Sequence, residues 1–207
     1  EPSGKSAPPG AIVPMWQRRP ARPSQRAATQ RAGRAGVRSL AGMTYRLAVV
    51  GGGNMGAALV GGLLQAGWAA SDIAVVEVLA PRAAELEALF PGVAVCAEVP
   101  ACAAAVIAVK PHDAPAACAA AAAVGATRLL SIAAGVPLAT LQQAAGPKVA
   151  VVRAMSNTPA LVGQGAAAIA AGETAAAADM DWAEAILGAV GTVVRVGEQH
   201  LDAVTGL

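Results

Sequence analysis

The chain has 207 residues, of which 56% are apolar and 14% are charged. A chain of this length can bury a substantial core, which argues against a small scaffold that depends on disulfides or a metal ion. Much of the apolar content is alanine, and Gly, Pro and polar residues interrupt the longest uncharged stretches. We therefore expect a soluble, cytoplasmic protein without the ~18-residue apolar run of a membrane-spanning helix.

The positive charge is concentrated at the start of the chain. Residues 1–42 hold eight Lys or Arg side chains and one acidic residue, a net charge of +7; the whole chain carries +2, so residues 43–207 carry −5. Six prolines and little apolar periodicity predict that residues 1–42 are a disordered basic leader or a spurious upstream extension ahead of Met43. An Arg-rich targeting peptide is the alternative. We expect no nucleic-acid or membrane partner.

The three cysteines, Cys96, Cys102 and Cys118, are odd in number and have no C-x-x-C spacing. This pattern argues against a disulfide framework and against a metal site. We expect reduced, buried thiols that pack as small apolar side chains, as in a cytoplasmic protein.

From residue 46 onward, short β-branched runs alternate with alanine-rich segments of helical length. This alternation predicts an α/β fold of β-α-β units with a mainly parallel sheet. Strands are expected at residues 46–50, 72–78, 93–96, 104–109, 127–133, 148–154, 166–172 and 192–197. Helices are expected at residues 54–66, 81–89, 114–123 and 137–145, in a short segment from Val99, and in a segment that ends near Gly188.

Gly51, Gly53 and Gly56 form the pattern G-x-G-x-x-G between the first predicted strand and the first predicted helix. In a dinucleotide site these glycines permit the tight turn, leave room for the pyrophosphate, and let helix and strand pack closely. The helix start, at Asn54 and Met55, offers unpaired N–H groups to phosphate. We predict a dinucleotide-binding turn; the alternative is a purely structural glycine-rich bend.

Glu77 lies at the end of the second predicted strand, 21 residues after Gly56. An acidic side chain at this place accepts a hydrogen bond from a ribose 2′-hydroxyl and repels a 2′-phosphate, which favours NAD. Arg82 follows soon after and offers a guanidinium that matches phosphate geometry, which favours NADP. Arg82 can equally be a solvated residue of the next helix, so the choice between NADH and NADPH stays open.

Five further blocks occur in one order along the chain: "GGGNMGAALVGGLLQAG", "AVKPHD", "SIAAGVPLATL", "VRAMSNTPALVGQG" and "LDAVTGL". Together they resemble the pyrroline-5-carboxylate reductases over nearly all of residues 45–207. The resemblance implies a Rossmann-like doubly wound fold. It also implies an oxidoreductase that reduces 1-pyrroline-5-carboxylate to L-proline with NADPH or NADH, the last step of proline biosynthesis.

The resemblance places the cofactor and the imino acid at the carboxyl ends of the strands. The segments 108–111, 133–135 and 157–159 then join the glycine turn and Glu77. The implied cofactor residues are Gly51, Gly53, Asn54, Met55, Gly56, Glu77, Ala108, Val109, Lys110, Pro111, Ala133, Ala134, Gly135 and Asn157, and the implied substrate residues are Asn157, Thr158 and Pro159.

Bland alternatives stand beside some of these roles. Lys110 can be a surface charge, and Asn157 and Thr158 can simply shape the turn before Pro159. Arg153 can neutralise a substrate carboxylate or be an ion-paired strand residue. Ser156 departs from the family, which usually has proline there, so we expect a more flexible loop.

The family continues past the position of Leu207 into a helical domain that forms the dimer and carries the proposed proton donor. We therefore expect three parts: a leader at 1–42, a Rossmann-like dinucleotide-binding domain at 43–198, and the start of a missing C-terminal helical domain at 199–207. On this view no catalytic residue lies in this chain, and a homodimer or higher homo-oligomer needs the helical domain. The alternatives are a catalytically silent dinucleotide-binding module and another Rossmann dehydrogenase, such as one that acts on β-hydroxy acids.

Overall fold

The structure is a computed structural model that describes residues 44–201. The basic segment 1–42 and the last residues of the predicted C-terminal part, 202–207, lie outside the described residues. Everything below concerns residues 44–201.

In the described part of the chain, eight strands form one sheet in the order β3-β2-β1-β4-β5-β6-β7-β8. Strands β1 to β6 are parallel, β7 is antiparallel to β6, and β8 is parallel to β7. The mainly parallel, Rossmann-like sheet is therefore confirmed. The bounds are β1 Leu47–Val50, β2 Ile73–Val76, β3 Ala94–Cys96, β4 Ala104–Ile107, β5 Arg128–Ser131, β6 Ala150–Ser156, β7 Gly165–Ala171 and β8 Gly191–Arg195.

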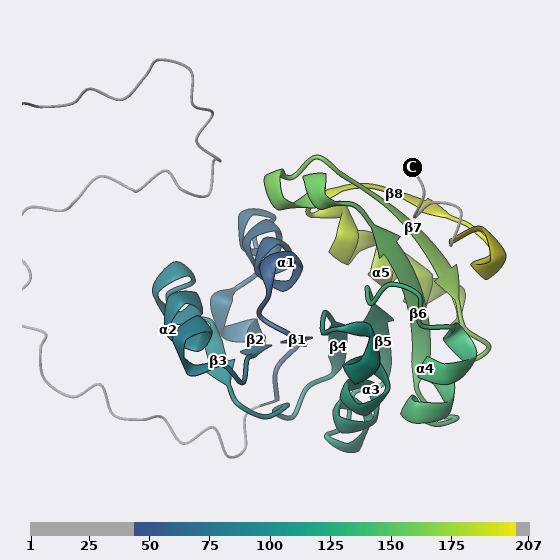
Figure 1. Cartoon of the computed structure of the whole chain (residues 1–207), viewed down its shortest axis with the longest axis horizontal. Coiled ribbons are helices and arrows are strands. Elements are labelled where there is room, and N and C mark those ends of the chain that lie inside the picture. Colours follow the sequence, from purple (N-terminus) through teal and green to yellow (C-terminus); the bar gives the residue numbers. More distant parts are fainter. Residues whose placement is uncertain (1–43, 202–207) are drawn as a thin grey trace, which may run out of the picture. The chain divides into compact units, whose positions relative to one another are not determined.

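Helices cover both faces of this sheet, as the runs of strand residues buried on both sides require (Figure 1). Leu59 of α1, Leu86 of α2 and Ile186 of α5 pack into the core of one face. Cys118 of α3 and Leu141 of α4 pack into the core of the other. The bounds are α1 Asn54–Gln65, α2 Ala80–Leu89, α3 Ala114–Ala123, α4 Leu138–Ala145 and α5 Ala177–Gly188.

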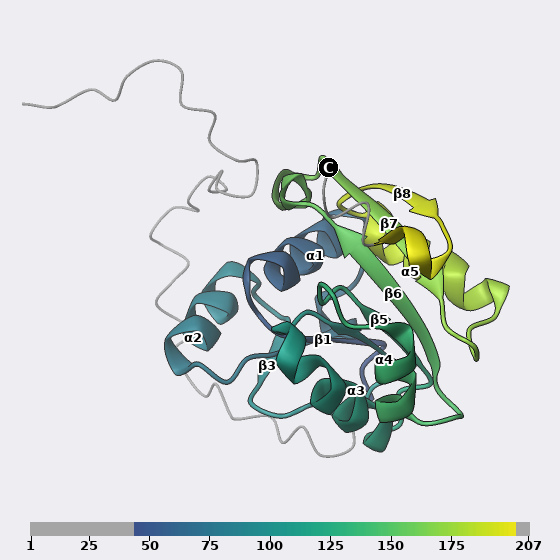
Figure 2. The same ribbon diagram turned by 45° about the vertical axis from the view of Figure 1, so that its right-hand side comes forward.

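Short 3-10 turns complete the described chain, and two of them bear on the site. η3 (Pro111–Asp113) leads into α3, and η4 (Thr158–Val162) links β6 to β7. In Figure 2, β6, β7 and β8 lie together at one end of the sheet, with α5 beside them. None of the helices within residues 44–201 is long and apolar enough to cross a membrane.

The predicted helix at Val99 is wrong. Residues 97–103 form bends and extended chain, and Tyr45 and Cys102 make an isolated parallel bridge. Tyr45 N–H donates to Ala101 C=O at 2.8 Å, and Ala103 N–H donates to Tyr45 C=O at 2.9 Å. Because Pro100 has no N–H and its neighbours bond to Tyr45, this segment cannot close a helical turn.

The strands that lead into the predicted site end earlier than expected. β2, β4 and β5 end at Val76, Ile107 and Ser131 rather than at residues 78, 109 and 133. After β4 and β5 the next residues are apolar and partly packed against the core, as Val109 and Ile132 are, so they extend the strand pattern into the loops. After β2 the β-branched pattern continues to Val78, although Val78 is exposed. These loops contain most of the predicted site residues.

Two of the three cysteines are buried. Cys102 and Cys118 are 1% and 0% exposed, and burial raises the pKa of each thiol from 9.0 to about 11. Cys96 is only half-buried, which corrects the expectation of three buried thiols, because β3 is the edge strand of the sheet. Burial also raises the pKa of Cys96.

We predict that native chains expose one reactive thiol. At pH 8 a thiol with a pKa of about 11 is about 0.1% ionised, and the thiolate is the nucleophile, so Cys102 and Cys118 will not react with Ellman's reagent. Denaturation will release all three thiols, and Cys96→Ser will abolish the native reaction. Reaction of a Cys96→Ser chain under native conditions at the rate of an exposed thiol would show that the core is open.

Candidate cofactor-binding site

The structure brings every predicted site segment to one edge of the sheet. The glycine turn, Glu77, residues 108–111, residues 132–135 and residues 157–159 follow β1, β2, β4, β5 and β6. These five strands are neighbours in the sheet and all parallel, so their carboxyl ends share one edge. The strand order reverses between β1 and β4, and ligands of open α/β sheets bind at such a switch point.

Two glycines of the turn are required by the protein itself. Gly51 has φ +108°, and a β-carbon on it would lie 2.5 Å from the carbonyl oxygen of Ala108. A β-carbon on Gly56 would overlap the carbonyl oxygen of Gly51. Only glycine therefore allows β1, β4 and α1 to approach this closely.

Gly53 is different, because nothing in the described structure requires a glycine there. Its backbone is extended, with φ −63° and ψ −172°, and no atom lies within 4 Å of the place where its β-carbon would be. Gly53 is the N-cap of α1, and no side chain caps this helix within the described residues. The N–H groups of the first turn, at Asn54 and Met55, thus have no capping side chain in the described residues and lie beside a residue without a side chain, which suits a phosphate group.

Glu77 lies directly over the turn. A β-carbon on the buried Gly52 would be 3.0 Å from Glu77 Oε2. Glu77 Oε1 accepts a hydrogen bond from Leu79 N–H at 2.9 Å. Arg82 of α2 also contacts the turn, because its Nε donates to Gly52 C=O at 2.8 Å. Its Nη1 pairs with Glu85 at 2.8 Å.

The loop after β4 passes beside the glycine turn. Ala108 N–H donates to Val50 C=O at 2.8 Å, which continues the contact of β1 with β4 by one residue. Ala108 and Val109 are half-buried, while Lys110 and Pro111 are exposed. Lys110 therefore projects from the site edge into solvent.

The three predicted residues in the loop after β5 differ in their exposure. Ala133 is 3% exposed and packs into the core, with its N–H 3.4 Å from the Oγ of the buried Ser131. Ala134 and Gly135 are exposed, and Gly135 has φ +71° with open space around it. Ala134 and Gly135 are thus the residues of this block that are accessible to a ligand.

Asn157 shapes the turn that follows β6. Its Oδ1 accepts from Ala166 N–H at 2.9 Å, and its own N–H donates to Ala166 C=O at 3.2 Å. Among the described residues, the Asn157 amide nitrogen donates no hydrogen bond. Thr158 and Pro159 are exposed at the start of η4.

Ser156, which stands where the family usually has proline, is the last residue of β6 and pairs with Ala167. The strand that we expected to end at residue 154 therefore continues to Ser156.

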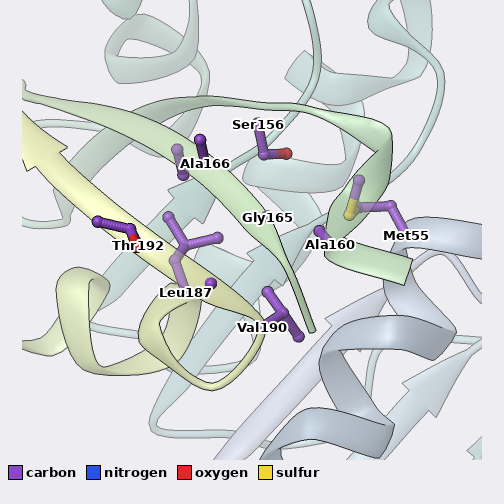
Figure 3. Close-up of a pocket in the computed structure, with 10 residues that line it drawn as sticks. Met55, Ser156, Ala160, Gly165, Ala166, Leu187, Val190 and Thr192 are labelled. Carbon is purple, nitrogen blue, oxygen red and sulfur yellow. The ribbon is translucent and has the colours of Figure 1, made fainter. Parts of the chain in front are cut away.

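A small pocket lies between the start of α1 and the turn that follows β6 (Figure 3). Met55 of α1 and Ala160 of η4 lie next to each other at one end of it, and Ser156 lies above them. The pocket has room for about one water molecule and not for a cofactor. It brings Met55, a predicted cofactor residue, next to Ser156 and Ala160, which flank the predicted substrate residues 157–159.

Arg153 pairs with Ser131, the last residue of β5, so it lies at the carboxyl end of the sheet. It is 4% exposed, and its Nη1 lies 3.0 Å from Glu198 Oε1. The same oxygen accepts from Leu138 N–H, at the start of α4, at 2.6 Å. Of the two roles considered for Arg153, a substrate-carboxylate partner or an ion-paired strand residue, the structure shows the ion pair. Glu198 was missed, because no local pattern marks a carboxylate that caps a helix 60 residues away.

Comparisons with known proteins agree with this geometry. Residues 46–135 match the family model described as "NADP oxidoreductase coenzyme F420-dependent". The chain is 38% identical over 170 residues to a pyrroline-5-carboxylate reductase of Pseudomonas aeruginosa, across 79% of this chain and 62% of the relative. The chain thus spans about three fifths of the length of that relative.

Solved structures give the same picture. A pyrroline-5-carboxylate reductase from Coxiella burnetii superposes with a TM-score of 0.73 at 28% identity, over 80% of this chain and 64% of that one. The Plasmodium falciparum pyrroline carboxylate reductase, solved with NADP bound, has the same fold, with a TM-score of 0.66 at 22% identity over 78% and 61% of the two chains. In sequence and fold the chain is thus similar to pyrroline-5-carboxylate reductases over about three fifths of their length.

Proposed function

We propose that this chain is the cofactor-binding part of an NADPH- or NADH-dependent reductase that converts 1-pyrroline-5-carboxylate to L-proline in proline biosynthesis. The observation that carries the proposal is Gly53. It is a glycine that neither backbone strain nor packing requires, and it opens an uncapped helix at the switch point of a parallel sheet. The Plasmodium relative with NADP bound supports the cofactor class.

The described residues fit a dinucleotide in three places. The uncapped N–H groups of Asn54 and Met55 and the open face of Gly53 would hold the pyrophosphate. Glu77 would bind the ribose of the adenosine half at the end of β2. Val78 and Leu79, which are 77% and 64% exposed, would offer apolar contact beside that ribose.

The nicotinamide half would lie toward β4, β5 and β6. Lys110, the exposed pair Ala134 and Gly135, and Asn157 follow three neighbouring strands at this part of the edge, where they would lie beside the nicotinamide. The cofactor supplies a hydride to the imine carbon when bound, and the protein holds the two reacting atoms within reach of each other. The free amide nitrogen of Asn157 would donate to a carboxylate or carboxamide oxygen, with Thr158 and Pro159 beside the imino acid.

We assign no proton donor to the described residues. The substrate site would be shared with a helical domain that also forms a homodimer or larger homo-oligomer, as the family resemblance implies. A second candidate function is a catalytically silent dinucleotide-binding module, which would bind the cofactor at the same turn without reducing an imino acid.

A titration and an assay on the full chain separate these functions. NADH or NADPH binding is followed by cofactor fluorescence, and 1-pyrroline-5-carboxylate reduction by loss of the reduced cofactor's absorbance. Binding with turnover supports the reductase. Binding without turnover supports the silent module, and failure to bind either cofactor would contradict both.

We predict that Gly53→Ala leaves the fold intact and weakens binding of both cofactors about tenfold, because the new methyl group occupies open space where the pyrophosphate would lie. Gly188→Ala is the matched control, since its β-carbon also meets open space but far along α5. Thermal melts and cofactor titrations of both variants check this. If Gly53→Ala binds both cofactors with unchanged affinity, the pyrophosphate does not lie against Gly53.

Gly51→Ala has a different expected effect. Because Gly51 has φ +108° and its β-carbon would press on the Ala108 carbonyl oxygen, this variant should lose about 1–3 kcal/mol of unfolding free energy. Urea denaturation measures the loss. A stability equal to that of the parent chain would contradict the close approach of β1 and β4.

Asn157 is tested by two substitutions that separate its roles. Asn157→Asp keeps the acceptor for Ala166 N–H but removes the free amide donor, so we expect an unchanged melting temperature and about tenfold weaker cofactor binding. Asn157→Ala removes both and should also cost about 1 kcal/mol of stability. Parent-like binding by both variants would leave Asn157 with the turn-shaping role alone.

A further inference from the structure

We infer that this chain distinguishes the two cofactors at the ribose of the adenosine half, and that it binds NADH more tightly than NADPH because of Glu77. The inference rests on the proposed function, since it concerns the same cofactor site. It adds which of the two reduced cofactors the site takes, and which residue makes the choice.

The position of the Glu77 carboxylate carries the inference. The half-buried side chain turns back over Gly52, and Oε2 lies 3.0 Å from the place of a Gly52 β-carbon. Leu79 N–H holds Oε1 at 2.9 Å, which fixes the carboxylate in this direction. No described group donates to Oε2. A fixed carboxylate oxygen without a donor, beside the pyrophosphate turn, suits a ribose hydroxyl and opposes a phosphate.

Arg82 is the group that would reverse this preference, and its guanidinium is engaged elsewhere. Nε donates to Gly52 C=O at 2.8 Å, and Nη1 pairs with Glu85 Oε2 at 2.8 Å. The fork that would grip a phosphate with two parallel hydrogen bonds is thus divided between the glycine turn and the outside of α2. Arg82 acts in this structure as a brace for the turn.

The local charge also opposes a phosphate at this place. Residues 73–103, which run from β2 through α2 and β3 to the start of β4, contain one cationic side chain, Arg82. The same residues contain four carboxylates: Glu77, Glu85, Glu87 and Glu98. A 2′-phosphate at the end of β2 would therefore meet a net negative segment, and the nearest carboxylate is Glu77.

The test is a pair of titrations on the full 207-residue chain, with NADH and with NADPH, at one low ionic strength. We expect NADH to bind at least about tenfold more tightly, from the repulsion between the Glu77 carboxylate and a 2′-phosphate at short range. Equal affinities, or tighter NADPH binding, would overturn the inference and leave the proposed function standing. If neither cofactor binds, the proposed function fails and the inference fails with it.

Two variants identify the residue responsible. Glu77→Gln keeps the acceptor for Leu79 N–H and loses only the charge, so NADPH affinity should rise until the preference falls below about threefold. Glu87→Gln removes the same charge from an exposed site on α2 and should leave the preference unchanged. A preference that survives Glu77→Gln, or that Glu87→Gln also removes, would overturn the role of Glu77.

Arg82→Gln distinguishes two roles of Arg82: stabilising the glycine turn and binding the 2′-phosphate. If Arg82 braces the turn, its loss weakens NADH and NADPH binding by the same factor, so the ratio of the two affinities stays constant. If the variant lowers NADPH affinity alone, Arg82 reads the 2′-phosphate and the inference is overturned.

Discussion

The arrangement depends on one close approach, at the point where β1 and β4 part. The chain leaves β1 at Gly51, turns with φ +108°, and passes within contact distance of the Ala108 carbonyl before α1 begins. Gly56 then lets the first turn of α1 lie on that same turn. Because neither position tolerates a β-carbon, the start of α1 is fixed against the sheet, and its unpaired N–H groups point at the carboxyl edge.

The other segments at the carboxyl edge are held against the glycine turn and the start of α1 by side-chain contacts. Arg82 reaches back from α2 to Gly52, and Met55 of α1 packs beside Ala160 of η4. At the end of β5, Glu198 ties the start of α4 to the buried Arg153. The site residues thus stand on a rigid frame, with open positions at Gly53, Gly135 and the Asn157 amide.

Local sequence pattern was enough to predict most of the frame. The alternation of β-branched and alanine-rich segments placed all eight strands and the five α-helices of the described residues. The glycine spacing placed the turn. Apolar residues after β4 and β5 made these strands look longer than they are, since loop residues that pack on the core look like strand residues.

Local sequence patterns could not predict contacts between distant parts of the chain. Arg82 and Gly52 are 30 residues apart, and only the structure shows that the guanidinium donates to the glycine turn. The helix expected at Val99 failed because Tyr45, far earlier in the chain, takes the backbone bonds of residues 101–103. Glu198 and the half-buried Cys96 were set by tertiary packing in the same way.

The central claim is that one cofactor lies along the carboxyl ends of five neighbouring strands. Hydrogen–deuterium exchange of the full chain, with and without saturating NADH, tests it directly. The account predicts slower exchange in three separate segments, at residues 52–56, 77–79 and 134–135, and no change in α3 or β8. Protection confined to one of these segments, or protection on the opposite edge of the sheet, would contradict it.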